Sequence, residues 1–178
     1  FDVIINLCGD NIGTSLWTTK KKERILNSRT STTEQLVKYC LELGEQAPRL
    51  FNASAIGAYG PGADRVDEYS ATHTTSNHFL AHVGTAWEAA LEPMTRRGLP
   101  IVILRFGVVI SPNGGMLKNL LPSFRLGLGA TVGDGSQILS WVGLPDVINA
   151  IAFLLQKADS NGVYNIVAGT PVKQKDFS

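Results

Sequence analysis

The residues with the clearest chemical potential lie in one short stretch, 49–62, which reads RLFNASAIGAYGPG. Its first half is apolar and too short for a helix, and small residues and a Tyr-Gly-Pro-Gly turn follow, so the pattern predicts a buried strand that ends in an open loop. Ligands of α/β proteins bind at the carboxyl ends of parallel strands, where Ser54 and Tyr59 would present hydroxyl groups. The alternative is that Ser54 satisfies local backbone groups and Tyr59 packs on the sheet.

Two further groups of residues resemble ligand sites but lack essential members. The glycine-rich segment 127–135 has no Lys-Ser/Thr pair and follows no strong strand, so it matches neither the P-loop nor the dinucleotide fingerprint, and a mobile loop is the better interpretation. His78 and His82 are four residues apart and would share a helix face, but no activating glutamate or third ligand accompanies them. We therefore predict no metal site.

The composition is that of an ordinary globular domain. With 16 Lys+Arg against 15 Asp+Glu, the net charge of +1 argues against nucleic acid or an anionic membrane as a partner. The basic run 20–24 is expected to be a solvated helix face. Cys8 and Cys40 fit buried free thiols in a reducing compartment, and no apolar run is long enough to span a bilayer. A cytoplasmic location is therefore the default expectation.

Strands and helices alternate along the first two thirds of the chain. The hydrophobic pattern predicts strands over 2–7, 49–53 and 101–110, and helices over 18–43 and 77–97. Weaker signals predict a helix over 116–128, a strand over 137–144, a helix over 146–155 and a strand over 163–167. Because parallel neighbours need a crossover and a helix supplies it, this order predicts an α/β fold with a parallel sheet and helices on its faces.

A resemblance to a known family is carried by the order of several segments, among them DVIINLCGDNI, FNASAIGAYG, HFLAHVGTAWEAA, LPIVILRFGVVISPNGG and LPSFRLGLGATVGDGSQILSWVGLPDV. Together they resemble the extended short-chain dehydrogenase/reductase superfamily, and within it the atypical epimerase/dehydratase-like branch, also labelled nucleoside-diphosphate-sugar epimerase or SulA homologue. The resemblance implies an incomplete Rossmann-like fold in which the first three strands would precede Phe1, leaving an exposed apolar edge on the strand at 2–7. Residues from roughly 116 to 178 would include part of a small substrate-side region.

The same resemblance implies an NAD(P) cofactor and assigns roles to particular residues. Ser54 would polarise the substrate, and Tyr59 is the nearest candidate for acid/base work. The backbone at Leu7, Cys8 and Gly9 would pack against the adenosine half of the cofactor, and Arg29 stands where many relatives have an asparagine. The other implied cofactor contacts are Ala53 and, as the wall of the nicotinamide side, Phe106, Gly107, Val108, Val109 and Pro112.

One departure from the family pattern leaves the function open. The Tyr-x-x-x-Lys pair of the superfamily, placed by reference to Glu88, falls on Leu80 and Gly84, which cannot transfer protons. One interpretation is an NAD(P)-dependent epimerase or oxidoreductase acting on an unknown small molecule that resembles a nucleotide sugar. The second is a non-catalytic NAD(P)-binding or regulatory scaffold, and the third is a remnant that binds nothing.

Overall fold

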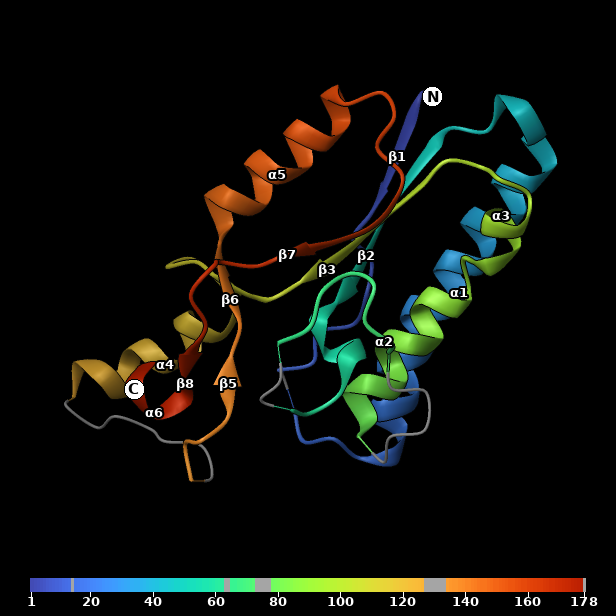
Figure 1. The fold of residues 1–178 in the computed structure, drawn as a ribbon. Helices are drawn as coiled ribbons and strands as arrows, with labels where there is room; N and C mark the ends of the chain where they lie inside the picture. The colour runs from blue at the N-terminus through green and yellow to red at the C-terminus, as the bar shows by residue number, and fades with distance from the viewer. Residues whose placement is uncertain (14, 63–64, 73–77, 127–133, 178) are drawn as a thin grey trace.

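The central element of the structure is a parallel sheet at which the predicted strands meet. The computed structural model describes residues 1–13, 15–62, 65–72, 78–126 and 134–177. Within them, β1 (Val3–Asn6), β2 (Arg49–Ala55), β3 (Ile101–Phe106) and β7 (Gly162–Ile166) lie side by side in that order (Figure 1). All three neighbouring pairs are parallel. The predicted neighbours, 2–7 beside 49–53 and 49–53 beside 101–110, are therefore confirmed.

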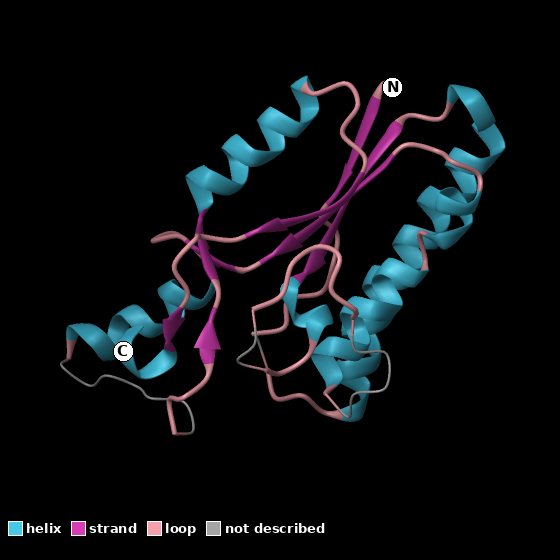
Figure 2. Ribbon diagram, viewed as in Figure 1, coloured by secondary structure: helices cyan, strands magenta, loops and turns pink. Residues whose placement is uncertain are grey.

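Helices cover both faces of this sheet (Figure 2). On one face lie α1 (Thr19–Leu43), α2 (Phe79–Ala89) and α3 (Glu92–Arg96), and on the other lies α5 (Leu144–Gln156). A hydrophobic core lies on each face of the sheet, and successive residues of β2 pack into opposite cores because side chains alternate along a strand. Leu50 packs with α1 and α3, and Phe51 packs with α5. The Rossmann-like α/β arrangement predicted from the sequence is confirmed.

The longest helix, α1, ends at the predicted residue and begins one residue after the predicted start. Thr18 caps it, since its hydroxyl oxygen accepts a hydrogen bond from the backbone N–H of Lys21 at 3.2 Å. Gly44 ends it with a φ of 57°, a conformation that residues with a side chain rarely adopt. Ile25, Val37 and Cys40 form the buried stripe that anchors the helix.

Two predicted elements are interrupted in the structure. The predicted helix over 77–97 divides between α2 and α3, where Pro93 lies in the first turn of the second helix. The predicted strand over 101–110 divides at Gly107 into β3 and β4 (Val108–Ile110), and β4 leaves the main sheet to pair with β6 (Trp141–Gly143). A Cβ on Gly107 would lie 2.7 Å from the carbonyl oxygen of Ser140, so the chain needs glycine at this crossing.

The remaining elements form short structures around the sheet. They are η1 (Gly44–Gln46), η2 (Ile56–Tyr59), α4 (Gly115–Arg125), β5 (Ile138–Leu139), β8 (Val172–Lys173) and α6 (Gln174–Phe177), with β5 and β8 antiparallel. Within the segment 116–178, β7 is a strand of the main sheet and α5 packs on it. By contrast, α4, α6, β5 and β8 gather beside the sheet (Figure 1). Most of the glycine-rich segment, 127–133, lies outside the described residues.

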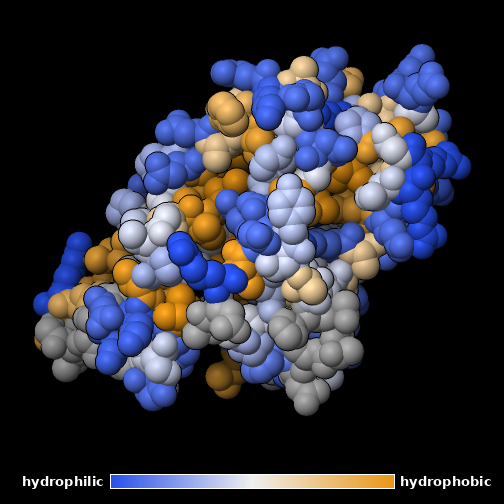
Figure 3. Space-filling model, viewed as in Figure 1, coloured by the Kyte–Doolittle hydropathy of each residue, from blue (hydrophilic) through white to orange (hydrophobic). Residues whose placement is uncertain are grey.

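Some hydrophobic side chains remain on the surface. In Figure 3 they are visible around α5, which exposes Leu144, Ile148 and Phe153. Within the described residues β1 pairs with β2 alone, and Ile5 and Leu7 are 43% and 59% exposed. The apolar edge expected on the strand at 2–7 is therefore present. Among the helices that the structure describes, none has the length and apolar character needed to cross a bilayer.

Candidate active site

The predicted site residues converge on the carboxyl edge of the sheet. Leu7, Cys8 and Gly9 follow β1 and are exposed, whereas Ala53, inside β2, is 5% exposed. The other cofactor candidates end β3 or follow it: Phe106, Gly107, Val108 and Val109 are half-buried, and Pro112 is exposed. Cys40 is buried, but the expectation of a buried thiol is wrong for Cys8, because this residue lies beyond the last hydrogen-bonded residue of its edge strand.

A buried ion pair between α2 and β3 forms the centre of this edge. Arg105 donates to the carboxylate of Glu88 from Nε at 2.8 Å and from Nη2 at 2.6 Å. Ser54, which lies beside Arg105 in the sheet register, donates its hydroxyl hydrogen to the same carboxylate at 2.5 Å. The hydrogen bonds that Arg105 donates to Glu88 raise the pKa of Arg105 above its ordinary value, so the guanidinium stays charged.

Tyr59 is bound to the other side of the guanidinium. Its phenolic oxygen accepts from Nη1 of Arg105 at 2.7 Å, and the guanidinium lies 4.7 Å from the ring centroid. The single phenolic hydrogen is directed at the side chain of Asn165 at 2.9 Å or the carbonyl of Asp67 at 2.8 Å. Ser54 and Tyr59 are 3% and 6% exposed, so both hydroxyls lie inside one polar network. Their catalytic roles stay predictions.

A second buried polar network holds the turn after β1. Asn6 donates from Nδ2 to Thr33 at 3.1 Å and to Asn52 at 2.6 Å, and its Oδ1 accepts from the backbone N–H of Cys8 at 3.1 Å. Trp87 donates from Nε1 to the hydroxyl of Thr33 at 2.9 Å. The network therefore fixes the backbone at Cys8 by contacts that extend through α1 to α2.

Arg29 of α1 holds the same turn from the other side. Its Nη1 donates to the carbonyl of Asp10 at 3.1 Å and to that of Ile25 at 2.9 Å. Its guanidinium carbon lies 5.1 Å from the ring centroid of Trp87, and a Cβ on Gly9 would lie 2.8 Å from it. The turn can approach the guanidinium this closely only because Gly9 has no side chain.

The carboxylate of Asp10 ties the turn to the start of α1. It accepts from Nζ of Lys21 at 2.9 Å and from Nε of Arg24 at 2.7 Å, and these cations lower the pKa of Asp10 to about 2. Lys21 is 5% exposed, so the expectation of a solvated face over 20–24 is wrong at this residue. The reason is its ion pair, which allows a charged side chain to be buried.

The places of the absent tyrosine and lysine also lie at this edge. Leu80 is 39% exposed and, with Gly57, Gly60, Pro61, His78 and Ala81, lines a cavity of about 220 Å³. Gly84 packs directly on η2, since a Cβ added to it would lie 2.9 Å from the Cβ of Ala58. A lysine at position 84 would therefore require α2 to move away from η2. Within the described residues no three His, Cys, Asp or Glu side chains cluster as metal ligands.

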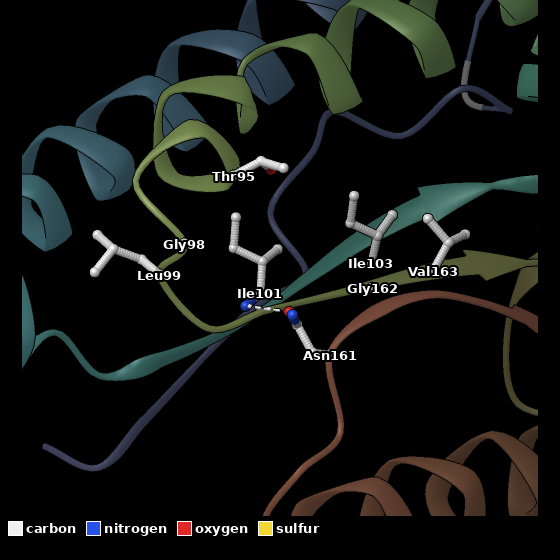
Figure 4. Close-up of a pocket in the computed structure, with 8 residues that line it drawn as sticks. All are labelled: Thr95, Gly98, Leu99, Ile101, Ile103, Asn161, Gly162 and Val163. Carbon is white, nitrogen blue, oxygen red and sulfur yellow. Dashed lines mark hydrogen bonds between the residues drawn. The ribbon is translucent and has the colours of Figure 1, made fainter.

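A second pocket lies at the opposite, amino end of the strands (Figure 4). Its volume is about 190 Å³, and it is lined by Thr95, Gly98, Leu99, Ile101, Ile103, Asn161, Gly162 and Val163. The amide of Asn161 is engaged, because its Oδ1 accepts from the backbone N–H of Ile101 at 3.1 Å. This lining is mainly apolar and contains no acid or base, so the pocket offers no group for catalysis.

Sequence reasoning missed the residues that bind the predicted hydroxyls. Arg105 and Asn165 had no assigned role, and Glu88 served only as a reference position. A usable signal was present, because Arg105 is the one charged residue in the apolar run IVILRFGVVI and Asn6 the last polar residue in FDVIINL. Polar side chains in buried strands need partners, so both positions pointed to buried networks.

Comparison with known proteins identifies relatives along almost the whole chain. Residues 1–167 match the NAD dependent epimerase/dehydratase family. Epimerase family protein Mb2239 of Mycobacterium bovis is 37% identical over 177 residues, which cover 99% of this chain and 58% of the relative. Epimerase family protein YfhF of Bacillus subtilis is 34% identical, with 99% and 57% covered. The chain thus spans about 58% of the length of a curated relative.

Solved structures show the same fold. The human epimerase family protein SDR39U1 (isoform 2), crystallised with NADPH, superposes with a TM-score of 0.87 at 30% identity, over 99% of this chain and 60% of that one. The nucleoside-diphosphate sugar epimerase of Corynebacterium glutamicum has a TM-score of 0.80 at 31% identity, over 99% and 36%. The chain belongs to the NAD-dependent epimerase/dehydratase family.

Proposed function

We propose that this chain carries an NAD(P)-binding edge, and that the full-length protein is an NAD(P)-dependent epimerase or oxidoreductase acting on a nucleotide-sugar-like small molecule. One observation carries the proposal. The exposed turn Leu7–Gly9 is held from both sides, by Asn6 and by Arg29, at the carboxyl edge of adjacent parallel strands. Such an edge is where α/β proteins bind nucleotides.

The residues at this edge fit a dinucleotide. Gly9 offers bare backbone, and the two residues before it are exposed. The half-buried residues Phe106–Val109 and the exposed Pro112 form a wall after β3. When bound, NAD(P) would accept or return a hydride. The NADPH in the human relative and the name of the Corynebacterium protein support this assignment.

The remaining properties follow from composition. The net charge of +1 supports a small-molecule substrate rather than nucleic acid. The free thiols of Cys8 and Cys40 support a reducing compartment, and we place the protein in the cytoplasm.

The test is cofactor binding followed by turnover in the full-length protein. NADH and NADPH titrations followed by fluorescence should give saturable binding, and Gly9→Val should weaken it at least tenfold, because the new side chain meets Arg29. Gly169→Val is the matched control, since a Cβ there has no neighbour within 4 Å. Products from a panel of nucleoside-diphosphate sugars would then be identified by NMR. Absence of binding to both cofactors would reject the proposal.

The second candidate function is non-catalytic NAD(P) binding. It is favoured by Gly84, whose contact with Ala58 leaves no room for the lysine of the superfamily. The engagement of Ser54 and Tyr59 with the Glu88–Arg105 pair supports it as well. Tight cofactor binding without conversion of any sugar in the panel would favour this function over the first.

A further inference from the structure

Arg29 has hydrogen-bond donors for which the described residues provide no acceptor. Its Nη1 is occupied by the carbonyls of Asp10 and Ile25, but Nε and Nη2 have no acceptor among the described residues. No buried side-chain nitrogen or oxygen of the described residues lacks a partner, so these two donors must reach solvent. The half-buried guanidinium therefore presents one edge outward beside Gly9.

The orientation of this edge is fixed. The guanidinium lies over the ring of Trp87 at 5.1 Å, and Gly9 packs so closely on it that an added Cβ would lie 2.8 Å from its carbon. The two bonds from Nη1 prevent rotation in the plane. An arginine that is ordered before a ligand arrives loses little conformational entropy on binding it.

Among the described residues, no carboxylate group contacts the guanidinium of Arg29. Its bond to Asp10 goes to the backbone carbonyl, and the carboxylate of Asp10 is bound by Lys21 and Arg24 instead. Burial lowers the pKa of Arg29, which reflects the cost of removing its charge from water. A negatively charged ligand at the open edge would offset that cost.

The geometry points to Arg29 as an oxyanion-binding residue whose Nε and Nη2 hold two oxygens of a diphosphate. These adjacent donors form a planar fork that matches two oxygens of a phosphate group. Gly9 allows such a group to approach, because no side chain covers the guanidinium there. The inference rests on the proposed function for the identity of the ligand, since either the cofactor or a nucleoside-diphosphate sugar would supply a diphosphate.

The test is calorimetric titration of the full-length protein with inorganic pyrophosphate, NADH and UDP at low and high salt. Arg29→Met should weaken pyrophosphate binding by on the order of tenfold to a hundredfold and make it less sensitive to salt. Arg29→Lys keeps the charge but loses the fork, so its affinity for pyrophosphate should lie between those of the unmodified protein and Arg29→Met. Lys38→Met is the control, because it removes an exposed charge from the same helix.

The nucleotide titrations identify the source of the oxyanion. If Arg29→Met binds NADH more weakly than the unmodified protein does but binds UDP equally well, the site belongs to the cofactor. If only the binding of UDP is weaker, the site belongs to the substrate. If the unmodified protein binds pyrophosphate but not UDP, NADH or NADPH, the oxyanion site stands and the proposed function fails. Unchanged binding of all three probes by Arg29→Met overturns the inference. The inference is also overturned if Arg29→Met loses affinity for pyrophosphate while the salt dependence stays unchanged, because Arg29 would then only support the turn.

Discussion

Glu88 and Arg105 lie on different elements, 17 residues apart, and form a two-pronged ion pair in which the side chains are 13% and 6% exposed. The pair also binds the hydroxyls of Ser54 and Tyr59, so the residues with the clearest chemical potential are partners of one buried charge pair. A buried ion pair is not in itself strongly stabilising, but removal of one partner leaves the other charge unpaired.

Arg105→Met should therefore destabilise the chain severely. Glu88 would keep its buried carboxylate without a cation, and the expected loss is about 3 to 5 kcal/mol in the free energy of unfolding. Urea unfolding followed by circular dichroism measures it. The matched control is Arg96→Met, which removes an exposed ion pair with Glu92. It should cost less than about 1 kcal/mol. Equal losses in the two variants would show that Arg105 is not a buried, paired charge.

The ion pairs of Asp10 predict a pH dependence. Its pKa is lowered from 3.8 to about 2 by Lys21 and Arg24, so the carboxylate stabilises the folded chain above about pH 4. That contribution is lost as the pH falls from 4 to 2. Asp10→Asn should consequently be less stable than the original chain at pH 6, and the difference should shrink between pH 4 and pH 2. A difference that stays constant over this range would contradict the assigned pKa.

The sequence predicted the order of the sheet because each strand is an apolar run bounded by turn residues. It also placed Ser54 and Tyr59 at the carboxyl edge. It could not predict the bond of Ser54 to Glu88 or that of Tyr59 to Arg105, which depend on the β2–β3 register and on how α2 lies over the sheet. The break of the predicted strand at Gly107 was missed for a similar reason, since it depends on Ser140, 33 residues later.

The contact between Gly84 and Ala58 gives a prediction with an unusual sign. Alanine in place of a helical glycine ordinarily stabilises a helix by about 1 kcal/mol. Here the new Cβ would lie 2.9 Å from that of Ala58, so Gly84→Ala should instead destabilise the chain by about 1 to 3 kcal/mol. Thermal unfolding is the measurement. Adding Ala58→Gly should restore part of the loss, and failure to do so would show that the steric contact is not the cause.

The sequence of this chain contains no Gly-x-Gly-x-x-Gly fingerprint. Because that loop supplies the backbone amides that bind a pyrophosphate at a helix amino end, we expect the isolated 178-residue chain to bind NADH and NADPH weakly. Calorimetric titration of the isolated chain provides the check, with the full-length protein as the reference. Micromolar binding at normal stoichiometry would contradict the expectation.

The final prediction concerns the coupling of Ser54 and Tyr59. They bind opposite sides of the Glu88–Arg105 pair, so they should interact energetically only through it. Ser54→Ala removes one donor from Glu88, and Tyr59→Phe leaves Nη1 of Arg105 without its acceptor. Each change should cost about 1 to 3 kcal/mol, because a buried polar group loses a partner. In the double variant the losses should deviate from additivity by at least about 0.5 kcal/mol.

A second cycle in an Arg105→Met background tests the route of this coupling. With the guanidinium absent, no hydrogen bond among the described residues links the two hydroxyls, and the Ser54→Ala and Tyr59→Phe losses should become additive. Chemical unfolding of all eight combinations supplies the free energies. Coupling that persists without Arg105 would mean that the hydroxyls communicate by another path, such as a shift of η2 against β2. Coupling that disappears would identify the ion pair as the link and would separate structural losses from any loss of activity in the full-length protein.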